Sequence, residues 1–423
     1  MNYEEAMSFL DETKKYGIQP GLTGIRALMR ELGDVQERIP IVHIAGTNGK
    51  GSVGAMLSSV LVESGYRTGR FDTPDVFSYE EEFLMNGKPI EKVRLAEIFT
   101  EVAATCQRLV QGGLPHPTRF EVETAAAFLW FYEENCDIAL VEVGMGGAED
   151  ATNLIQKSLV SVLTSISRDH TKFLGNTLTE IAGAKAGIIK EGCPVVAMEQ
   201  KPEAMAVIRK KCEESRASLV LAGKTDDRLM NISLGLAGEF QAENAACVLQ
   251  VLEVLKKDYP KICRETVREG LKKVRWPGRF EQIYAFPDVY LDGAHNEDAV
   301  LKLHASVNRS FPNRRIIYIM GVLADKEYDR MIHIMFREGD RVYTVTPPNP
   351  RALSATELAK QLQKEKIDAI PCENPRDAVS YALEAADAQD VILAFGSLYY
   401  LSGVRTAFRE LLGEYEIHGS IIK

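Results

Sequence analysis

The sequence has few of the features that would tie it to an oxidising compartment, a membrane or nucleic acid. Its seven cysteines form no CxxC pair, and their odd number indicates free thiols in a reducing cytoplasm. The N-terminal segment MNYEEAMSFLDETKKYG is acidic and lacks the apolar core of a signal peptide. No apolar run approaches the length of a membrane span. A net charge of −10 without a strongly basic stretch argues against nucleic acid. We therefore expect a cytoplasmic protein whose main partner is not nucleic acid.

Apolar segments alternate with helical patterns along the 423 residues, which is typical of α/β folds with mostly parallel sheets. The first part of the chain has strand-like segments at residues 39–45, 137–143, 159–166, 194–198 and 218–223. The segment VRWPGRFEQI interrupts this alternation, and a second series then follows with VYLDGA, RIIYIMGVLAD, RVYTVTP and VILAFGS. We predict a larger domain at residues 1–275 and a smaller one at residues 276–423.

The strongest chemical signal is GTNGKGS, residues 46–52, between a predicted strand and a predicted helix. Glycines allow backbone N–H groups to approach phosphate oxygens, and the start of a helix favours an anion. Lys50 can reach the β- and γ-phosphates of a nucleotide, while Thr47 or Ser52 can place a hydroxyl near a metal ion. The spacing differs from the usual Walker A sequence because Gly51 separates the lysine from the serine. A glycine-rich turn with a surface lysine is the alternative.

Polar residues also follow other predicted strands. Glu142 ends the apolar segment IALVE, where a charge is costly unless it is paired or binds a metal. Since ligand sites of parallel sheets form outside such strand ends, we predict a magnesium ligand; a carboxylate that caps nearby backbone is the alternative. Asp292, His295 and Asn296 follow a strand in YLDGAHN, which indicates a second site or an Asx turn. Arg279 in PGR is placed to contact a nucleotide phosphate.

Two further segments carry polar residues whose meaning depends on the whole set of motifs. SRDHTKFLGNTLTEIAGAKAGIIK contains His170 after a strand and Lys185 on a helical stretch. Taken alone, His170 is more often a histidine satisfied by hydrogen bonds, and Lys185 a solvated charge. FGSLYYLSG ends the last predicted strand and offers Ser397 and Tyr399.

In this order, the motifs resemble those of the folylpolyglutamate synthase/dihydrofolate synthase group of the Mur ligase family. The resemblance runs from about residue 3 to residue 410 and rests on HIAGTNGKGS, FEVETAAAFLWF, EVGMGG with DATN, DHTKFLGNTLTEIAGAKAGIIK, GEFQAENAA, WPGRFE, LDGAHN, GVLADKE and FGSLYYL. It implies a P-loop-type Mur ligase ATPase domain with a mostly parallel sheet, and a smaller, Rossmann-like C-terminal α/β domain. It also implies a monomeric, ATP-dependent amide ligase of folate biosynthesis and one-carbon metabolism. Such an enzyme adds L-glutamate to folates through an acyl phosphate, with dihydropteroate as a second acceptor.

The resemblance also implies roles for individual residues. ATP would be bound by the glycine-rich loop and three later residues: Gly46, Thr47, Asn48, Gly49, Lys50, Gly51, Ser52, Asn244, Arg279 and Asp292. Two magnesium ions would be held by Thr73, Glu142, His170 and Lys185. Lys185 would be carbamylated, because a carbamate supplies the oxygen ligands that magnesium prefers. Catalysis would depend on Lys50, Glu142, His170 and Lys185. Glutamate and folate would be bound near Asp75, His295, Ser397 and Tyr399.

Several positions depart from the family pattern. In TPDVFSYEEEF, Asp75 and Glu82 replace a histidine or apolar residue and an arginine, and Ala148 replaces another arginine. Each lost charge-assisted hydrogen bond weakens the binding of an acidic folate tail by about 1.5–3 kcal/mol. Two alternatives therefore stay open: a Mur-type ligase that acts on another carboxylate, and a catalytically silent nucleotide-binding relative. The predicted catalytic residues are all present, which disfavours the second alternative.

Overall fold

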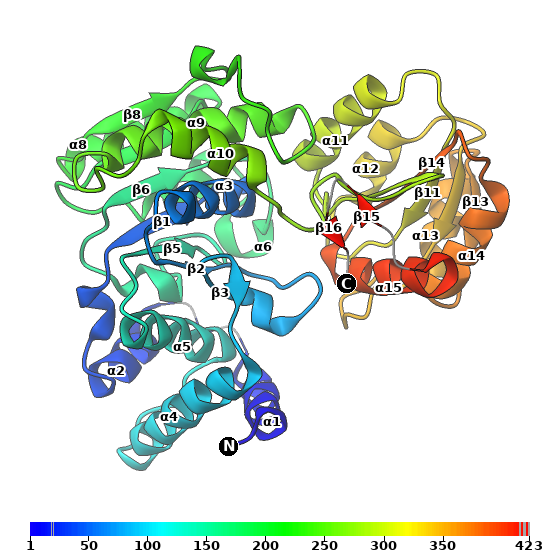
Figure 1. The fold of residues 1–423 in the computed structure, drawn as a ribbon. Coiled ribbons are helices and arrows are strands. Elements are labelled where there is room, and N and C mark those ends of the chain that lie inside the picture. Colours follow the sequence, from blue (N-terminus) through cyan, green and yellow to red (C-terminus); the bar gives the residue numbers. More distant parts are fainter. Residues whose placement is uncertain (18, 20, 414–415, 418–419, 422–423) are drawn as a thin grey trace. The chain divides into compact units, whose positions relative to one another are not determined.

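The computed structural model describes residues 1–423 except 18, 20, 414–415, 418–419 and 422–423 (Figure 1). The chain folds into two compact units, Met1–Gly235 with Ala242–Val274, and Leu236–Gln241 with Arg275–Lys423. Each unit is built on a mostly parallel sheet with helices, which confirms the predicted α/β class. Across the described residues, no helix combines the length and the apolar character of a membrane span.

The sheet of the first unit has eight strands in the order β4-β3-β2-β5-β1-β6-β7-β8. Strands β2, β5, β1, β6, β7 and β8 are parallel, while β3 and β4 add antiparallel at one edge. All five strands predicted before residue 275 are present, each shorter than predicted. The bounds are β1 (Ile41–Ala45), β2 (Thr68–Phe71), β3 (Phe83–Met85), β4 (Lys88–Pro89), β5 (Ile138–Glu142), β6 (Val160–Leu163), β7 (Val195–Met198) and β8 (Leu219–Ala222).

The helices of the first unit begin with clear local signals. Several of them start with a capping box, in which an N-cap side chain and the residue three positions later bond each other's amides. Examples are the pairs Asn2–Glu5, Thr118–Glu121 and Thr177–Glu180. The helices are α1 (Tyr3–Thr13), α2 (Thr23–Glu31), α3 (Lys50–Glu63), α4 (Lys92–Gln111), α5 (Arg119–Glu133), α6 (Thr171–Leu174), α7 (Leu178–Ala186), α8 (Pro202–Glu214), α9 (Phe240–Leu255) and α10 (Arg264–Lys273), with 3-10 turns η1 (Lys14–Tyr16), η2 (Val35–Arg38), η3 (Tyr79–Glu82), η4 (Ala151–Leu154) and η5 (Asp227–Leu229).

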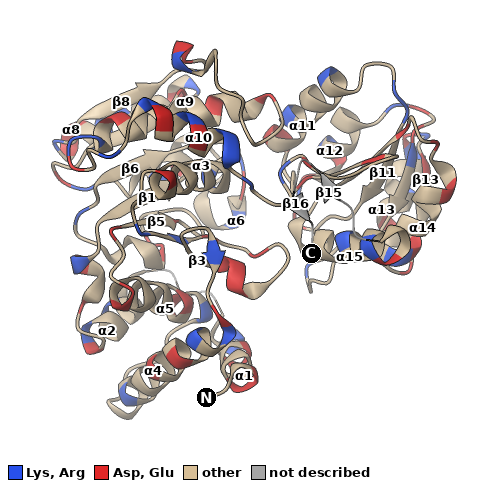
Figure 2. Ribbon diagram, viewed as in Figure 1, with Lys and Arg blue, Asp and Glu red and all other residues tan. Residues whose placement is uncertain are grey.

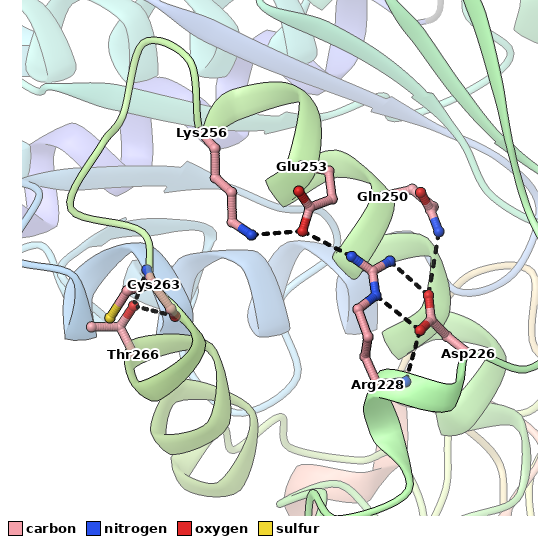
Figure 3. Close-up of polar contacts among 7 residues, drawn as sticks. All are labelled: Asp226, Arg228, Gln250, Glu253, Lys256, Cys263 and Thr266. Carbon is pink, nitrogen blue, oxygen red and sulfur yellow. Dashed lines mark hydrogen bonds and ion pairs between the residues drawn. The ribbon is translucent and has the colours of Figure 1, made fainter.

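A polar network ties α9 to the segment after β8 (Figure 3). Asp226 accepts a hydrogen bond from the backbone N–H of Arg228 at 3.0 Å and pairs with its guanidinium at 2.7 Å. The same guanidinium reaches Glu253 on α9 at 2.8 Å, and Gln250 donates to Asp226 at 3.3 Å. Exposed ion pairs of this kind each contribute at most about 1 kcal/mol. Their number still helps to position α9, which also carries Asn244.

The sheet of the second unit has six strands in the order β13-β12-β11-β14-β10-β9, all parallel except β9. The four strands predicted after residue 275 are present, and β9 and β13 were not predicted. The strands are β9 (Glu281–Ala285), β10 (Asp288–Leu291), β11 (Ile316–Met320), β12 (Arg341–Thr344), β13 (Asp368–Pro371) and β14 (Val391–Phe395), with a separate pair β15 (Glu416–Ile417) and β16 (Ser420–Ile421). The helices are α11 (Glu297–Ser310), α12 (Tyr328–Met335), α13 (Ala355–Lys364), α14 (Pro375–Ala385) and α15 (Leu401–Leu412), with the 3-10 turn η6 (Leu398–Tyr400).

Each unit has its own apolar core, and several phenylalanines belong to each core. The core of the first unit contains Phe71, Phe83, Phe99, Phe128 and Phe131, and that of the second contains Phe280, Phe311, Phe336 and Phe395. Lysines, arginines and carboxylates are interspersed on the helices of both units (Figure 2). This distribution agrees with the lack of a basic stretch in the sequence.

Candidate active site

The glycine-rich loop joins β1 to α3 and packs closely against its neighbours. A Cβ on Gly46 would lie 1.8 Å from Oγ1 of Thr164, and one on Gly49 would lie 2.6 Å from Oδ1 of Asn244. Gly49 also has a φ of 93°. Both positions therefore need glycine. Asn244, which we predicted to contact adenine, lies beside this loop.

Two amides of the loop bond to the protein itself. The N–H groups of Thr47 and Asn48 donate to the carbonyl of Ser165, at 2.7 and 3.3 Å. The Thr47 hydroxyl donates to the carbonyl of Ser167 at 3.0 Å and accepts from its N–H at 3.1 Å. Thr47 thus anchors the loop to the chain after β6, and its place near a metal ion stays a prediction.

Helix α3 begins without a side-chain cap. Gly49 is its N-cap, and the first intrahelical bond runs from the N–H of Val53 to the carbonyl of Gly49 at 2.9 Å. The amides of Lys50 and Gly51 therefore lie before the helical ladder, where the helix dipole is positive. Ser52 is buried on the same turn. This arrangement suits an anion such as a nucleotide phosphate.

Two carboxyl groups lie at the ends of neighbouring strands. Glu142 is the last residue of β5 and is 7% exposed, and its Oε1 lies 3.5 Å from Nζ of Lys50. Asp72 follows β2, lies near Glu142 and pairs with Arg70. Burial raises the pKa of Asp72 to about 7, Arg70 opposes that rise and Glu142 adds to it. Asp72 was not predicted, although its place after a strand is the signal that pointed to Glu142.

Lys185 on α7 lies against the glycine-rich loop. It is 4% exposed, and its Nζ donates to the carbonyl of Gly46 at 2.8 Å. Burial lowers the pKa of Lys185 to about 7, with Lys50 acting in the same direction and three nearby carboxylates opposing it. The structure therefore brings a partly neutral amine into the charged site at physiological pH.

His170 and Thr73 lie in the segments after β6 and β2. His170 is the exposed N-cap of α6, with a φ of 50°, and its N–H donates to Oδ1 of Asp169 at 2.8 Å. Thr73 is half-buried and follows Asp72 directly. No group of three or more His, Cys, Asp or Glu side chains among the described residues is arranged to hold a metal. The metal roles of His170 and Thr73 stay predictions.

The loop after β2 contains two of the charge changes noted in the sequence. Oε1 of buried Glu82 accepts from the N–H of Asp75 at 3.2 Å, and its Oε2 has no hydrogen-bond partner within the described structure. Glu123 on α5 pairs with Arg119 at 2.7 Å and accepts from the Tyr79 hydroxyl at 3.2 Å. Burial, followed by the charge of Glu123, raises the pKa of Glu82 well above its usual value. The cation of this cluster, Arg119, is thus already paired.

In the second unit, the carboxylate of Asp292 is bonded to backbone. Its Oδ2 accepts from the N–H of Phe280 and its Oδ1 from that of Ala294, both at 2.7 Å. Burial raises the pKa of Asp292, and the charge of Arg279 opposes the rise. A Cβ on Gly293 would lie 2.8 Å from Nη1 of Arg279. The PGR and LDGAHN motifs therefore pack against each other, and their contact with a nucleotide stays a prediction.

The remaining predicted residues of the second unit follow β10 and β14, which are neighbours in the sheet. Nδ1 of His295 lies 2.8 Å from the carbonyl of Gly293. Since a carbonyl only accepts, Nδ1 carries a proton, and a neutral ring has its lone pair on Nε2. Asn296 caps α11, and Asp292, which accepts from the N–H two residues on, makes the Asx turn that we considered for this segment. Ser397 is buried and accepts from the N–H of Tyr399 at 3.4 Å, while Tyr399 is 36% exposed.

Comparison with known proteins places the chain in a family. The Mur ligase middle domain matches residues 44–225, and the Mur ligase glutamate ligase domain matches residues 278–398. The chain belongs to the Mur ligase family. The first match contains the loop, Glu142 and Lys185, and the second contains the residues from Arg279 to Ser397.

Several Mur ligases resemble this one over nearly its whole length. The dihydrofolate synthase/folylpolyglutamate synthase of Bacillus subtilis is 36% identical, over 95% of this chain and 98% of that protein. The folylpolyglutamate synthase of Lacticaseibacillus casei is 32% identical, over 96% and 98%. The structure of Mycobacterium tuberculosis folylpolyglutamate synthase complexed with ADP has a TM-score of 0.88 and 31% identity, covering 96% of this chain and 98% of that one. This Mur ligase is therefore a member of the folylpolyglutamate and dihydrofolate synthase group, as the motif order predicted.

Proposed function

We propose that the protein is an ATP-dependent ligase that joins the amino group of L-glutamate to the carboxyl group of a folate or of dihydropteroate. One observation carries the proposal. Lys50, Glu142 and Lys185 gather at the uncapped start of α3 in a member of the folylpolyglutamate and dihydrofolate synthase group. That grouping supports ATP binding at the strand ends of the first unit, because a helix start and a lysine bind phosphates.

The reaction requires one phosphoryl transfer and one acyl transfer. The γ-phosphoryl group of ATP moves to a carboxylate oxygen of the acceptor, which gives an acyl phosphate and ADP. The glutamate amine then attacks the acyl carbon, an amide forms and phosphate leaves. Lys50 and the amides of Lys50 and Gly51 hold the triphosphate. Such transfers depend mainly on positioning and on neutralised charge.

Magnesium fits the oxygen donors at this sheet edge. Glu142 and Thr73 would hold one ion, and His170 with Lys185 a second. Magnesium is usually bound by one or two carboxylates together with waters and substrate phosphates. This preference agrees with the neighbouring carboxyl groups of Glu142 and Asp72 and with the lack of a three-residue cluster among the described side chains. When bound, the ion neutralises phosphate charge.

We also propose that Lys185 is carbamylated. A neutral amine adds to CO2, an N–C bond forms and a proton is released; burial, which lowers the pKa of Lys185 to about 7, favours that neutral amine. With ¹³C-bicarbonate, we expect a carbamate signal by NMR that Lys185→Met removes. Lys190→Met is the matched control, because burial also lowers the pKa of Lys190, to about 8. A signal that persists in Lys185→Met would contradict the assignment.

The choice of acceptor depends on the charge behind the loop after β2. Glu82 and Glu123 put buried carboxyl groups behind the loop after β2, and Arg119 is already paired with Glu123. A folate tail brings additional carboxylates, whereas dihydropteroate has one. We therefore propose that dihydropteroate is used at least as well as reduced folates. Asp75, His295, Ser397 and Tyr399 remain the candidates for contacts with acceptor and glutamate.

One assay tests the function directly. Purified protein is incubated with ATP, Mg²⁺ and labelled glutamate, together with dihydropteroate or a reduced folate. We expect labelled product with ADP formed in equal amount. ATP turnover only with a different carboxylate would support the broader Mur-type ligase instead, and nucleotide binding without turnover would support a silent relative.

The proposal also covers the cellular compartment and the oligomeric state of the protein. All seven cysteines are free thiols, which supports a reducing cytoplasm. We propose a cytoplasmic monomer, as the family resemblance implies. Light scattering during size exclusion should give the mass of one 47.0 kDa chain.

A further inference from the structure

A buried hydrogen-bond chain runs from β1 to the segment after Glu142. Nε2 of His43 lies 2.8 Å from Oγ1 of Thr152, and that hydroxyl donates to Oδ1 of Asp150 at 2.6 Å. All three side chains are buried. The hydroxyl has a single hydrogen, which it gives to the carboxylate, so His43 must donate from Nε2. The chain therefore fixes both the ring tautomer and the direction of the Thr152 hydroxyl.

Asp150 in turn holds the glycine-rich turn that follows β5. Its Oδ2 accepts from the N–H of Met145 at 2.8 Å. The N–H of Thr152 adds a bond to Oδ1 at 3.1 Å. The direction in which the chain leaves Glu142 thus depends on one buried carboxylate.

The far end of the same turn is bonded to α7. The N–H of Ala148 donates to the carbonyl of Ala184 at 2.8 Å. A Cβ on Gly147 would lie 2.9 Å from the carbonyl oxygen of Lys185, so the two backbones are in close contact. Asn153 donates to the carbonyl of Gly187 at 3.2 Å. The turn therefore spans the distance between Glu142 on β5 and Lys185 on α7.

The burial of His43 lowers the stability of the fold. It is fully buried in a central strand, and its Nδ1 has no hydrogen-bond partner within the described part of the chain. An unpaired buried nitrogen destabilises a fold, and an apolar side chain would avoid that penalty. The bond from Nε2 to Thr152 is the contact that an apolar residue could not make. It explains why a histidine is present here.

We propose that His43 and Thr152 are positioning residues, which act through Asp150 to set the turn between Glu142 and Lys185 and thereby the magnesium-dependent binding of nucleotide. The inference rests on the proposed function. Neither side chain is placed to touch the reacting atoms. Their effect should therefore appear in the contribution of magnesium to binding, rather than in nucleotide contacts that form without the ion.

The decisive comparison is between Thr152→Val, which removes the hydroxyl at similar volume, and Thr152→Ser, which keeps it. ADP binding is measured by calorimetry in Mg²⁺ and in EDTA, together with kcat and KM for ATP. We expect Thr152→Val to weaken binding in Mg²⁺ by about tenfold, a usual effect for residues behind a metal site, and to lower kcat. Binding in EDTA should change less than about twofold, and Thr152→Ser should recover most of the loss.

A matched control and a second pair of variants make the result specific. Thr124 on α5 is also buried, but its hydroxyl has no partner among the described residues, so Thr124→Val should change neither binding constant. His43→Gln keeps an N–H near the position of Nε2 and should bind ADP in Mg²⁺ better than His43→Leu. Magnesium-dependent binding that is equal in Thr152→Val and wild type would overturn the proposal, even if thermal stability falls. Wild-type protein without any gain from Mg²⁺ would instead overturn the proposed function.

Discussion

The two units use the same position, the carboxyl ends of parallel strands, in different ways. In the first unit, side chains from β5, α3 and α7 contact one another or the loop: Lys50 lies 3.5 Å from Glu142, and Lys185 donates to Gly46 at 2.8 Å. In the second unit, the side chains after β10 and β14 bond to the nearest backbone. Asp292 accepts from two amides, and Ser397 accepts from a third.

This difference indicates that the side chains at the strand ends of the first unit can bind ligands, whereas those of the second unit hold the local backbone. Lys50 and Glu142 lie 3.5 Å apart as an ion pair. When a nucleotide binds, Lys50 can contact a phosphate and Glu142 a cation in place of each other, without loss of local structure. The bonds of Asp292 to two amides define the turn itself, so a ligand could replace them only by reshaping that turn. We therefore expect substitutions at the charged residues of the first unit to change activity. Substitutions at Asp292 should mainly destabilise the turn that this side chain holds.

The largest effect should come from the first unit. We expect Lys50→Ala and Glu142→Ala each to lower kcat by at least about 100-fold, because each removes a charge that would hold nucleotide or metal in a partly buried site. The measurement is incorporation of labelled glutamate, with circular dichroism to show that the fold is kept. Lys224→Ala, at an exposed lysine of the same unit, is the control and should remain active. Near-normal activity in either site variant would contradict the conclusion that these side chains of the first unit serve catalysis.

The sequence predicts the fold best where strands are buried on both faces. The apolar segment IALVE became β5, which is buried throughout. Strand β2 (TGRF) was missed because it contains Arg70, which is buried and paired with Asp72. Strand β13 (DAIP) was missed because an aspartate and a proline bound a two-residue apolar pair. Local pattern cannot supply a partner that lies elsewhere in the fold.

The same limit applies to the candidate site. Lys50, Glu142 and Lys185 could be selected by motif and by strand ends, and the structure brings them together. The contact of His43 could not be predicted in this way, because its partner Thr152 is 109 residues away in the chain. The motif also gave no sign that two loop amides would be bonded to Ser165. Contacts between distant segments decide which polar groups serve the fold and which remain for a ligand.

A smaller effect should be seen in the second unit. We expect Asp292→Ala to destabilise the turns at Phe280 and Ala294 by about 1–3 kcal/mol, because two buried amides lose their acceptor. Hydrogen–deuterium exchange of peptides containing these amides measures the loss. Asp329→Ala, at an exposed carboxylate of the same unit, should leave exchange unchanged. Unchanged exchange in Asp292→Ala together with weaker ATP binding would mean that Asp292 is primarily a nucleotide ligand, and the two units would then be alike.

The smallest effect should appear as a pH dependence of the first unit. Burial, with a contribution from Lys190, lowers the pKa of His43 from 6.5 to about 3. Between these two values the unfolded chain binds a proton that the folded chain does not, so stability falls as the pH falls from 6.5. From pH 7.5 to pH 5.5 we expect a loss of about 1 kcal/mol that His43→Gln does not share.

Trp130 on α5 allows this loss to be assigned to the first unit. Its fluorescence can follow urea unfolding in a Trp276→Phe background, because these are the chain's two tryptophans. Wild type and His43→Gln should differ in the pH dependence of unfolding, and the difference should be confined to the window below about pH 6.5. An identical dependence would mean that the folded protein accommodates the protonated ring. His43 would then not be held as the neutral Nε2–H donor to Thr152, and the first unit would have no fixed hydrogen-bond chain behind its charged site.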